Sequence, residues 1–351
     1  MSGGVDSSMT ALLMQQAGYY CVGVHMRLQD ESSPDAVGAA DIARRLDMPF
    51  HEYDLAERFR DQVIKPFVEG YVAGETPNPC VACNRHLKFS ALLEIADELD
   101  CQYLATGHYA RIEHDDALNR WVVRTGLDSS KDQSYVLYTL SQEQLSRVVL
   151  PLGGYHKPEI RTLAAEAGFP NADKSDSQDI CFVPDNDYSD FIEDYLGKPC
   201  APGDMLDEGG KVVGRHQGLI RYTIGQRKGL GAHGRPVFVQ SINAQQNTIT
   251  IGDDEAALYT DSFLVRDFNW TALAQSPKSP LSCNIKVGYK HLLKPGTIQL
   301  VHLEGEEYVQ VTYSEPQRAV SPGQAAVFYG IGESADTVLG GGTIDRITNC
   351  K

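Results

Sequence analysis

The stretch that decides the fold of the N-terminal half is Ser2-Gly3-Gly4-Val5-Asp6-Ser7-Ser8, followed by residues 9–16, in which apolar residues recur at helical spacing. Glycines let backbone N–H groups approach an anion, and a helix N-terminus adds further donors and a favourable dipole. The hydroxyls of Ser2, Ser7 and Ser8 add ligands. The motif is not a GxxxxGK[ST] P-loop, because no lysine follows it. It predicts a phosphate loop at a strand-to-helix turn, and the plainer alternative is a glycine turn with a serine cap.

The residues after this loop alternate between strand-like and helical patterns, which is typical of a parallel α/β sheet. We expect strands at residues 19–26, 50–53 and 101–105, and helices at residues 34–46, 56–71 and 87–99. In such a fold a strand precedes the loop, and Met1 leaves no room for it. Loss of a central strand would expose apolar surface and strand edges, so we expect the natural chain to have several more residues upstream.

The pattern changes after residue 181. Residues 199–252 are rich in glycine and carry short alternating runs at 222–224 and 237–239. Alternation then dominates, with expected strands at residues 283–287, 297–302, 308–313 and 325–329. Regularly spaced short strands favour a small barrel or sandwich. The predicted organisation is an α/β parallel-sheet nucleotide-binding domain at 1–198, a small central module at 199–260 and an all-β, barrel-like domain at 261–351.

Charge argues in two directions. A net charge of −16, from 31 Lys and Arg against 47 Asp and Glu, opposes binding to nucleic acid, since phosphate contacts need clustered cations. Between Glu208 and Asp253, however, there is no acidic residue. A basic island on an acidic protein can still meet RNA, and a solvated basic loop is the alternative. Its cations are Lys211, Arg215, Arg221, Arg227, Lys228 and Arg235.

The chain reads as cytoplasmic, because it has no basic leader before an apolar stretch and no apolar run of ~18 residues. Eight cysteines in a reducing compartment do not predict a disulfide scaffold. Cys21, Cys101 and Cys283 lie in apolar surroundings and are interpreted as small buried hydrophobes. Cys80, Cys83 and Cys181, by contrast, belong to distinctive motifs.

Two cysteine segments carry a family resemblance. One is Thr76-Pro77-Asn78-Pro79-Cys80-Val81-Ala82-Cys83-Asn84, followed by Lys88-Phe89, and the other is Lys174-Ser175-Asp176-Ser177-Gln178-Asp179-Ile180-Cys181-Phe182. Further motifs stand at residues 105–109, 131–135, 225–231 and 321–324. Together with the loop, they resemble the bacterial tRNA-uridine 2-sulfurtransferases (2-thiouridylases), which belong to the PP-loop ATP pyrophosphatases. The similarity covers almost the whole chain.

The resemblance implies roles for individual residues. Cys83 falls on the family's nucleophile and Cys181 on its persulfide carrier. The contacts to ATP, which is used with Mg²⁺, fall on Ser2, Gly3, Gly4, Val5, Asp6, Ser7, Met26 and Gly107. The contacts to tRNA fall on Asn78, Pro79, Cys80, His108, Lys131, Asp132, Gln133 and Gln324, the first three of them at the target base. Gly288-Tyr289 replaces a frequent Arg-Tyr pair, which leaves Tyr289 available for stacking and puts a contact from Gly288 in doubt.

The implied chemistry is coherent. The C2 carbonyl of uridine is a poor electrophile, and adenylation of its oxygen turns that oxygen into part of a leaving AMP. A persulfide on Cys181 then supplies sulfur, and Cys83 attacks the S–S bond to leave a Cys83–Cys181 disulfide. Both need thiolate character, which Lys174 or a helix terminus would favour. The base must also leave its stack, at a cost of ~a few kcal/mol.

Cys80 stands where many family members carry Asp. It creates a Cys80-x-x-Cys83 motif that, with Cys181, could hold a [4Fe–4S] cluster with one open iron, able to deliver hydrosulfide without a persulfide. Zinc with a fourth ligand is also compatible. The sequence leaves the cluster and the persulfide pair as alternatives.

The expected target is the wobble uridine of tRNAs for Lys, Glu and Gln, with sulfur arriving from a cysteine desulfurase directly or through relay proteins. Two rival interpretations are a PP-loop enzyme that adenylates a small-molecule acceptor and a non-catalytic iron–sulfur protein that binds RNA. The paired cysteine segments and the basic residues oppose the first, and the SGGVDSS loop has no role in the second. The sulfur donor and the oligomeric state are left open.

Overall fold

The computed structural model describes residues 1–29, 34–174, 180–183, 187–289 and 291–348. Its N-terminal part contains α1 (Val5–Gln16), β1 (Gly23–Arg27), α2 (Pro34–Arg45) and β2 (Phe50–Asp54). β1 and β2 pair in parallel, with Gly23 opposite Phe50. A second parallel pair joins β3 (Leu104–Ala105) to β6 (Val148–Val149). The expected parallel α/β architecture is confirmed, although β1 begins at Gly23 because Tyr19 and Tyr20 lie exposed at the surface.

Met1 lies beside β1. Its amino group donates to the backbone carbonyl of Val24, and its own carbonyl lies 2.9 Å from Nδ1 of His25. The idea that a further strand stands upstream stays a prediction.

The helices that follow β2 carry the first cysteine segment. α3 (Ala56–Phe59) continues through a π-helical turn at Arg60–Ile64 into α4 (Lys65–Val72). α5 (Pro79–Cys83) continues through a π-helical stretch at Asn84–Ala91 into α6 (Leu92–Glu98). The helix expected at 87–99 therefore starts eight residues earlier, because Asn78 caps its first turn and Pro79 suits the first helical position. The remaining helices of this part are α7 (Gln142–Arg147) and α8 (Lys157–Glu166).

The C-terminal part is a closed antiparallel barrel, as expected. Its strands are β11 (Tyr259–Trp270), β12 (Leu281–Lys286), β13 (Lys294–Leu303), β14 (Glu306–Arg318), β15 (Ala325–Tyr329) and β16 (Thr337–Ile347). They run in the order β11-β14-β13-β12-β15-β16, and pairing of β11 with β16 closes the ring. Closure removes the exposed strand edges that an open sheet would leave.

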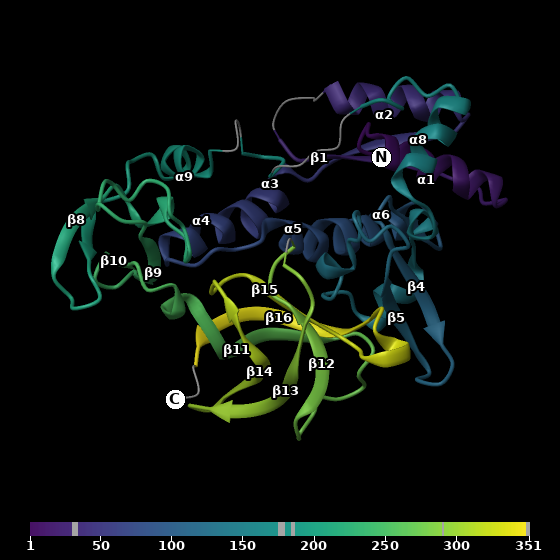
Figure 1. Ribbon diagram of the computed structural model, residues 1–351. Coiled ribbons are helices and arrows are strands. Elements are labelled where there is room, and N and C mark those ends of the chain that lie inside the picture. The colour runs from purple at the N-terminus through teal and green to yellow at the C-terminus, as the bar shows by residue number, and fades with distance from the viewer. Residues whose placement is uncertain (30–33, 175–179, 184–186, 290, 349–351) are drawn as a thin grey trace.

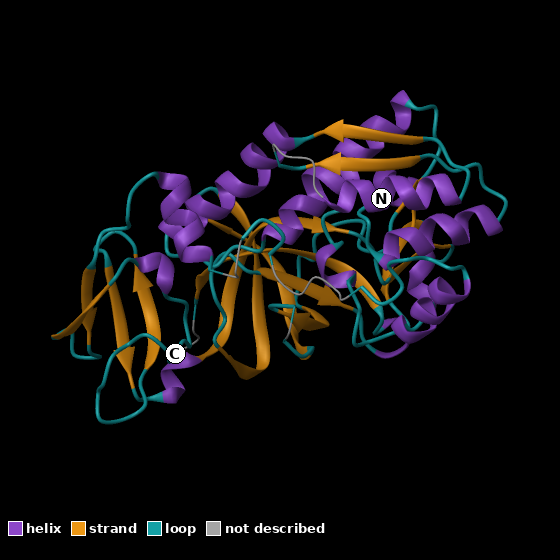
Figure 2. Ribbon diagram, turned by 90° about the horizontal axis from the view of Figure 1, so that it is seen from above, coloured by secondary structure: helices purple, strands orange, loops and turns teal. Residues whose placement is uncertain are grey.

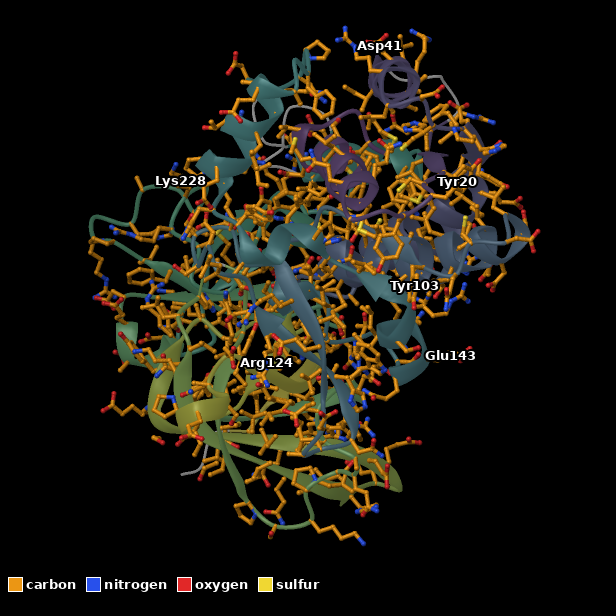
Figure 3. The ribbon with its side chains drawn as sticks, turned by 90° about the vertical axis from the view of Figure 1, so that its right-hand side faces the viewer. Tyr20, Asp41, Tyr103, Arg124, Glu143 and Lys228 are labelled. Atoms are coloured by element: carbon orange, nitrogen blue, oxygen red, sulfur yellow. The ribbon has the colours of Figure 1, made fainter. Side chains whose placement is uncertain are left out.

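A hairpin from the N-terminal part extends this sheet. β4 (Ala110–Asp115) and β5 (Arg120–Thr125) join it through β5, which pairs with β16 at Thr337 and Val338. Arg124 on β5 lies at this junction, 2.9 Å from Oδ1 of Asp336 (Figure 3). One hydrophobic cluster spans both parts, and its fully buried members include Phe89, Val123, Tyr135, Val327 and Tyr329. The two parts are consequently packed through a common core (Figure 1).

The central module stands apart at the end of the molecule away from the N-terminus (Figures 1 and 2). After α9 (Tyr188–Leu196) come β7 (Gly203–Leu206), β8 (Val212–His216), β9 (Phe238–Asn243) and β10 (Thr248–Gly252), in the order β8-β7-β10-β9. The alternating run at 222–224 forms no strand in the described residues: Tyr222 follows a short 3₁₀ turn and packs into the module's core.

Several cations of the basic island are engaged within the protein. Arg221 lies 2.9 Å from Glu193 on α9, and Arg235 lies 2.6 Å from Asp253. The guanidinium of Arg227 lies 5.4 Å from the centre of the Phe238 ring. Ion pairs therefore offset the charges of Arg221 and Arg235, and both alternatives for the basic island stay predictions. None of the helices in the described ranges combines the length and apolar character needed to cross a bilayer.

Candidate active site

The phosphate loop forms at the start of α1. Gly3 has a φ of 68°, which favours glycine, and Gly4 is the N-cap residue, with no side chain bonded to the cap. The hydroxyls of Ser7 and Ser8 each donate to the Gly4 carbonyl at 3.0 Å. The backbone N–H of Ser2 donates to Oγ of Ser7 at 3.1 Å. The hydroxyls of the loop thus hold it in place. The first-turn N–H groups of α1 have no partner within the helix, so they can stabilise an anion bound at its N-terminus.

Two distant segments support the loop. Nδ2 of Asn171 donates to the Gly3 carbonyl and to Oγ of Ser8, each at 3.0 Å. Gly107 follows β3, and a Cβ added there would lie 3.0 Å from Cβ of Asp6. The predicted contact residue Gly107 therefore lies against the loop, and only glycine fits without a shift. Asn171 was missed by sequence analysis, since nothing near it in the chain points to the loop.

Asp6 of the loop is paired with a lysine from α8. Nζ of Lys157 lies 2.7 Å from both Oδ1 and Oδ2 of Asp6. The hydroxyl of Tyr109 donates to Oδ1 of Asp6 at 2.8 Å, and Nζ of Lys157 lies 5.5 Å from the centre of the Tyr109 ring. The loop motif lacks a lysine of its own, but the fold brings one to it.

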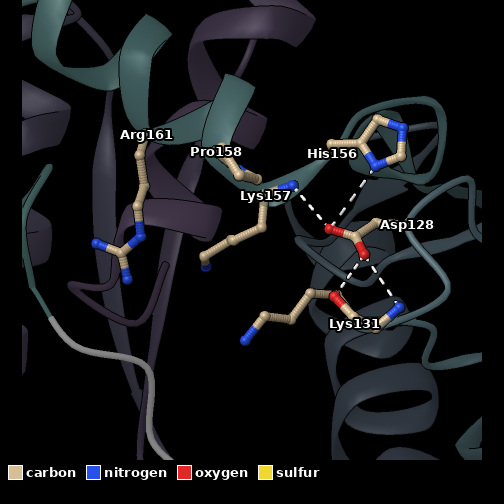
Figure 4. Close-up of a pocket in the computed structure, with 7 residues that line it drawn as sticks. Asp128, Lys131, His156, Lys157, Pro158 and Arg161 are labelled. Carbon is tan, nitrogen blue, oxygen red and sulfur yellow. Dashed lines mark hydrogen bonds and ion pairs between the residues drawn. The ribbon is translucent and has the colours of Figure 1, made fainter.

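A pocket of about 540 Å³ opens beside this pair (Figure 4). Cationic side chains dominate its lining. In Figure 4, Lys131, Lys157 and Arg161 point toward a common space, and His156 points away from it. The lining residues are Asp128, Ser130, Lys131, His156, Lys157, Pro158 and Arg161.

Cys80 and Cys83 lie on α5. Oδ1 of Asn78 accepts a hydrogen bond from the Cys80 backbone N–H at 3.1 Å, which caps the helix. Residues three apart on a helix share a face, so the two thiols are neighbours. Cys80 is exposed, whereas Cys83 is buried. Met26, at the end of β1, packs against the hydrophobic cluster that contains Cys83, which connects the predicted nucleotide contacts to the cysteine site.

The third cysteine, Cys181, belongs to the same neighbourhood. Burial raises the pKa of Cys83 to about 11, Lys88 opposes this shift, and the charges of Cys181 and Cys80 add to it. Desolvation also raises the pKa of Cys181, with Cys80 adding to the shift and Lys88 opposing it. All three thiols are free of disulfide bonds. Lys88 is a cation that favours both thiolates, and the role expected of Lys174 stays a prediction; motif residues 175–179 lie outside the described residues.

The three thiols do not form a metal-ligand set. Within the part of the chain that the structure describes, no three His, Cys, Asp or Glu side chains gather in a way that could hold a metal ion. An iron–sulfur cluster with one open iron needs three sulfur ligands at a single cluster. As they are placed in this structure, Cys80, Cys83 and Cys181 are not gathered around one metal position.

A barrel loop reaches the cysteine site. Burial raises the pKa of Tyr289, with Asp132 and Cys80 adding to the shift and Lys131 opposing it, so all four residues lie within electrostatic reach. Tyr289 is 46% exposed, and Nζ of Lys286 lies 5.6 Å from its ring centre. The fold thus brings together four of the predicted tRNA contacts, whereas Gly288 beside them is buried.

Other residues predicted to contact tRNA make hydrogen bonds or packing contacts within the protein. Oε1 of Gln133 accepts a hydrogen bond from the Tyr109 N–H at 2.9 Å. Oδ1 of Asp132 accepts one from Gly126 N–H at 2.9 Å. His108 is buried beside Phe89, and burial holds its pKa well below the usual range. A neutral, enclosed imidazole supports packing more directly than it supports a phosphate contact.

The barrel also holds the segment that leads into α5. Nε2 of Gln324 donates to the Thr76 carbonyl at 2.7 Å, and Thr76 N–H donates to the Pro322 carbonyl at 2.8 Å. Arg266 on β11 lies 3.1 Å from Glu75 and 2.8 Å from Asp345. We call this set of contacts the barrel clamp; Arg266 and Glu75 in it were not identified from the sequence.

A phosphate loop at a helix start within a parallel α/β domain is the arrangement of a PP-loop nucleotide-binding enzyme, and a group of thiols lies in the same domain. Comparison with known families agrees. Residues 1–185 match the tRNA methyl transferase HUP domain, residues 189–253 the tRNA methyl transferase PRC-barrel domain, and residues 260–344 the aminomethyltransferase beta-barrel domain.

Curated relatives narrow the family. The chain is 42% identical over 366 residues to the tRNA-specific 2-thiouridylase MnmA of Symbiobacterium thermophilum, with 99% of this chain and 92% of that protein covered. It is 40% identical over 358 residues to the protein of that name from Clostridioides difficile (99% and 97% covered). Against the Geotalea uraniireducens protein it is 42% identical over 367 residues (100% and 95% covered). The chain belongs to the tRNA-specific 2-thiouridylase family.

Proposed function

We propose that this protein uses ATP, with Mg²⁺, to replace the 2-oxygen of the wobble uridine with sulfur in tRNAs for Lys, Glu and Gln. The observation that carries the proposal is the convergence at α5. Cys83, Cys181 and Cys80 act on one another's ionisation there, Met26 from the end of β1 packs into the same cluster, and Tyr289 of the barrel faces Cys80. This convergence supports a site in which the nucleotide, sulfur and base contacts meet.

The first step is activation of the base. Ser2, Gly3, Gly4, Val5, Asp6 and Ser7, with Met26 and Gly107, hold ATP, and first-turn N–H groups of α1 stabilise the charge on the departing pyrophosphate. The uridine O2 attacks the α-phosphorus, the bond to pyrophosphate breaks, and an O-adenylated base remains. Asn78, Pro79 and Cys80 position that base, which has left its stack in the anticodon.

The second step transfers sulfur. The terminal sulfur of a Cys181 persulfide attacks C2, and AMP leaves with the original oxygen. The Cys83 thiolate then attacks the Cys181 sulfur, the S–S bond to the transferred atom breaks, and 2-thiouridine is released with a Cys83–Cys181 disulfide. The two electrons come from the Cys83 and Cys181 sulfurs, so a thiol reductant must reopen the disulfide before the next turnover.

In this proposal Lys131, Asp132, Gln133, Tyr289 and Gln324 contact the tRNA, and the buried residues His108 and Gly288 support them from within the protein. Residues 1–198 act as the catalytic domain, 199–260 as a central tRNA-binding module, and 261–351 as the barrel that completes the grip. A cysteine desulfurase or a relay protein loads Cys181, and the enzyme acts in the cytoplasm.

A [4Fe–4S] cluster on Cys80, Cys83 and Cys181 is the alternative route of sulfur delivery, although these thiols are not gathered around one metal position in this structure. The experiment that separates the two routes is anaerobic purification with iron and acid-labile sulfide analysis, paired with tRNA thiolation assays of Cys80→Ala, Cys83→Ala and Cys181→Ala. The persulfide route predicts loss of activity for Cys83→Ala and Cys181→Ala, an active Cys80→Ala variant and no bound iron. Near-stoichiometric cluster, with all three variants losing iron and activity, would replace it by the cluster route. A wild-type enzyme that releases pyrophosphate without tRNA would contradict the proposed substrate.

A further inference from the structure

We propose that Lys157 is the phosphate-binding cation of the ATP site, supplied to the loop by α8. This inference rests on the proposed use of ATP and adds a residue that the loop motif does not contain. The ammonium group of Lys157 lies 2.7 Å from both carboxylate oxygens of Asp6, across 151 residues of sequence. When ATP fills the loop, the same ammonium contacts its polyphosphate chain.

The charge of Asp6 makes such a cation necessary. Asp6 lies in the first turn of α1, at the end of the helix that receives the phosphates, and its side chain is 33% exposed. An uncompensated carboxylate there would repel a triphosphate in a partly dehydrated site. Lys157 neutralises Asp6 in the resting protein, and the Tyr109 hydroxyl, 2.8 Å from Oδ1, keeps the carboxylate in place.

The side chain of Lys157 is buried and held in a fixed position. Lys157 is 5% exposed, and its backbone N–H donates to Oδ2 of Asp128 at 3.0 Å. It occupies the first position of α8, ahead of Pro158, and a capping box between His156 and Glu159 fixes that turn. A lysine pre-positioned in this way loses little conformational freedom when it binds an anion.

The neighbouring cations mark the direction from which phosphate approaches. Lys131 and Arg161 line the pocket next to Lys157 and point into the same space (Figure 4). A concave, positively charged lining concentrates anions, and a lysine ammonium binds phosphate as a point charge. The chemical class of the ligand is therefore a polyphosphate, here the triphosphate of ATP and the pyrophosphate it releases.

The test is direct binding of a non-hydrolysable ATP analogue and of inorganic pyrophosphate to the full chain, without tRNA. For Lys157→Met we expect Kd for both probes to rise by about 10–100-fold, and for Lys157→Arg to recover most of that loss, because the charge is kept. Kd for tRNA stays within twofold of wild type in both variants. Lys65→Met is the matched control, since Lys65 also opens a helix ahead of a proline but is exposed.

A second pair of variants guards against a folding defect. Removing Lys157 alone leaves Asp6 uncompensated, whereas Asp6→Asn with Lys157→Met removes both charges. We expect that double variant to bind the analogue at least tenfold more weakly than Asp6→Asn alone. Equal affinities in this comparison, or an unchanged Kd for a folded Lys157→Met variant, would reduce Lys157 to a structural ion pair. The wild type could also bind the analogue in a Lys157-dependent way and yet fail to thiolate tRNA. That result would support this inference and reject the proposed function.

Discussion

Replacing Lys88 by methionine should raise the pKa of Cys83, the thiol that we propose resolves the persulfide. Burial raises the pKa of Cys83 from 9.0 to about 11, and Lys88 is the cation that opposes this shift. At pH 8 a thiol with a pKa of about 11 is ~0.1% thiolate, against ~10% for one at 9.0. An opposite charge within ~4–6 Å shifts a pKa by about one unit or more, so loss of Lys88 should reduce the thiolate population about tenfold.

The assay is alkylation of Cys83 by monobromobimane from pH 7 to 11, in a Cys80→Ser background so that Cys83 is the single cysteine of its tryptic peptide. The rate should rise tenfold per pH unit without a plateau below pH 10, since the raised pKa keeps the thiol protonated. Lys88→Met should lie about tenfold lower at each pH up to 9. The exposed Lys65→Met serves as the control.

Steric protection of a buried sulfur lowers the absolute rate, so the pH profile decides the outcome. A wild-type plateau near pH 8 would refute the reasoning, because Cys83 would then ionise readily despite its burial. Identical profiles for Lys88→Met and Lys65→Met would refute the role of Lys88 alone. The same pKa predicts that thiolation in a single turnover accelerates from pH 7 to 9.

Three further predictions follow from named contacts. Asn171→Ala removes two hydrogen bonds to the loop, one to the Gly3 carbonyl, and should raise KM for ATP about tenfold in a pyrophosphate-release assay. Gly323→Ala should lower the free energy of urea unfolding by about 1–2 kcal/mol, because Gly323 has a φ of 85° and an added Cβ would lie 2.8 Å from Cβ of Glu75. Tyr289→Ala should weaken tRNA binding about tenfold in filter-binding assays, and Tyr289→Phe should not, if the exposed ring stacks on a base.

The elements of this fold were predictable where periodicity is strong. The spacing of apolar residues changes from helical to alternating after residue 181, and the parallel α/β part and the closed barrel follow that change. The β4–β5 hairpin could also have been found, since residues 110–125 alternate around a polar turn. Its partner could not, because nothing local in Val123 specifies that β5 pairs with Val338 of β16.

The motifs of the site could be predicted from the sequence, but the contacts that join them across the fold could not. Motif residues such as Cys83 and Gly107 carry a local signature, whereas Lys157 and Asn171 act only through contacts across the fold. A lysine at a helix start looks the same in sequence whether it meets solvent, as Lys65 does, or the carboxylate of another element, as Lys157 does. The influence of Lys88 on both Cys83 and Cys181 was missed for a related reason, because it depends on how the fold brings the two cysteine segments together.

The barrel clamp makes the C-terminal domain part of the active site. Gln324 and Pro322 hold Thr76 by hydrogen bonds, and Asn78, two residues later, caps the helix that carries both Cys80 and Cys83. A helix moves as a unit over such a short length, so a shift of the barrel is transmitted to both sulfurs. Tyr289 of the barrel also lies within electrostatic reach of Cys80, so in the proposed function the barrel and the thiols act on the same RNA. Residues 1–198 expressed alone would lack these contacts and expose the shared core around Tyr135, so we expect that fragment to be unstable and inactive in tRNA thiolation.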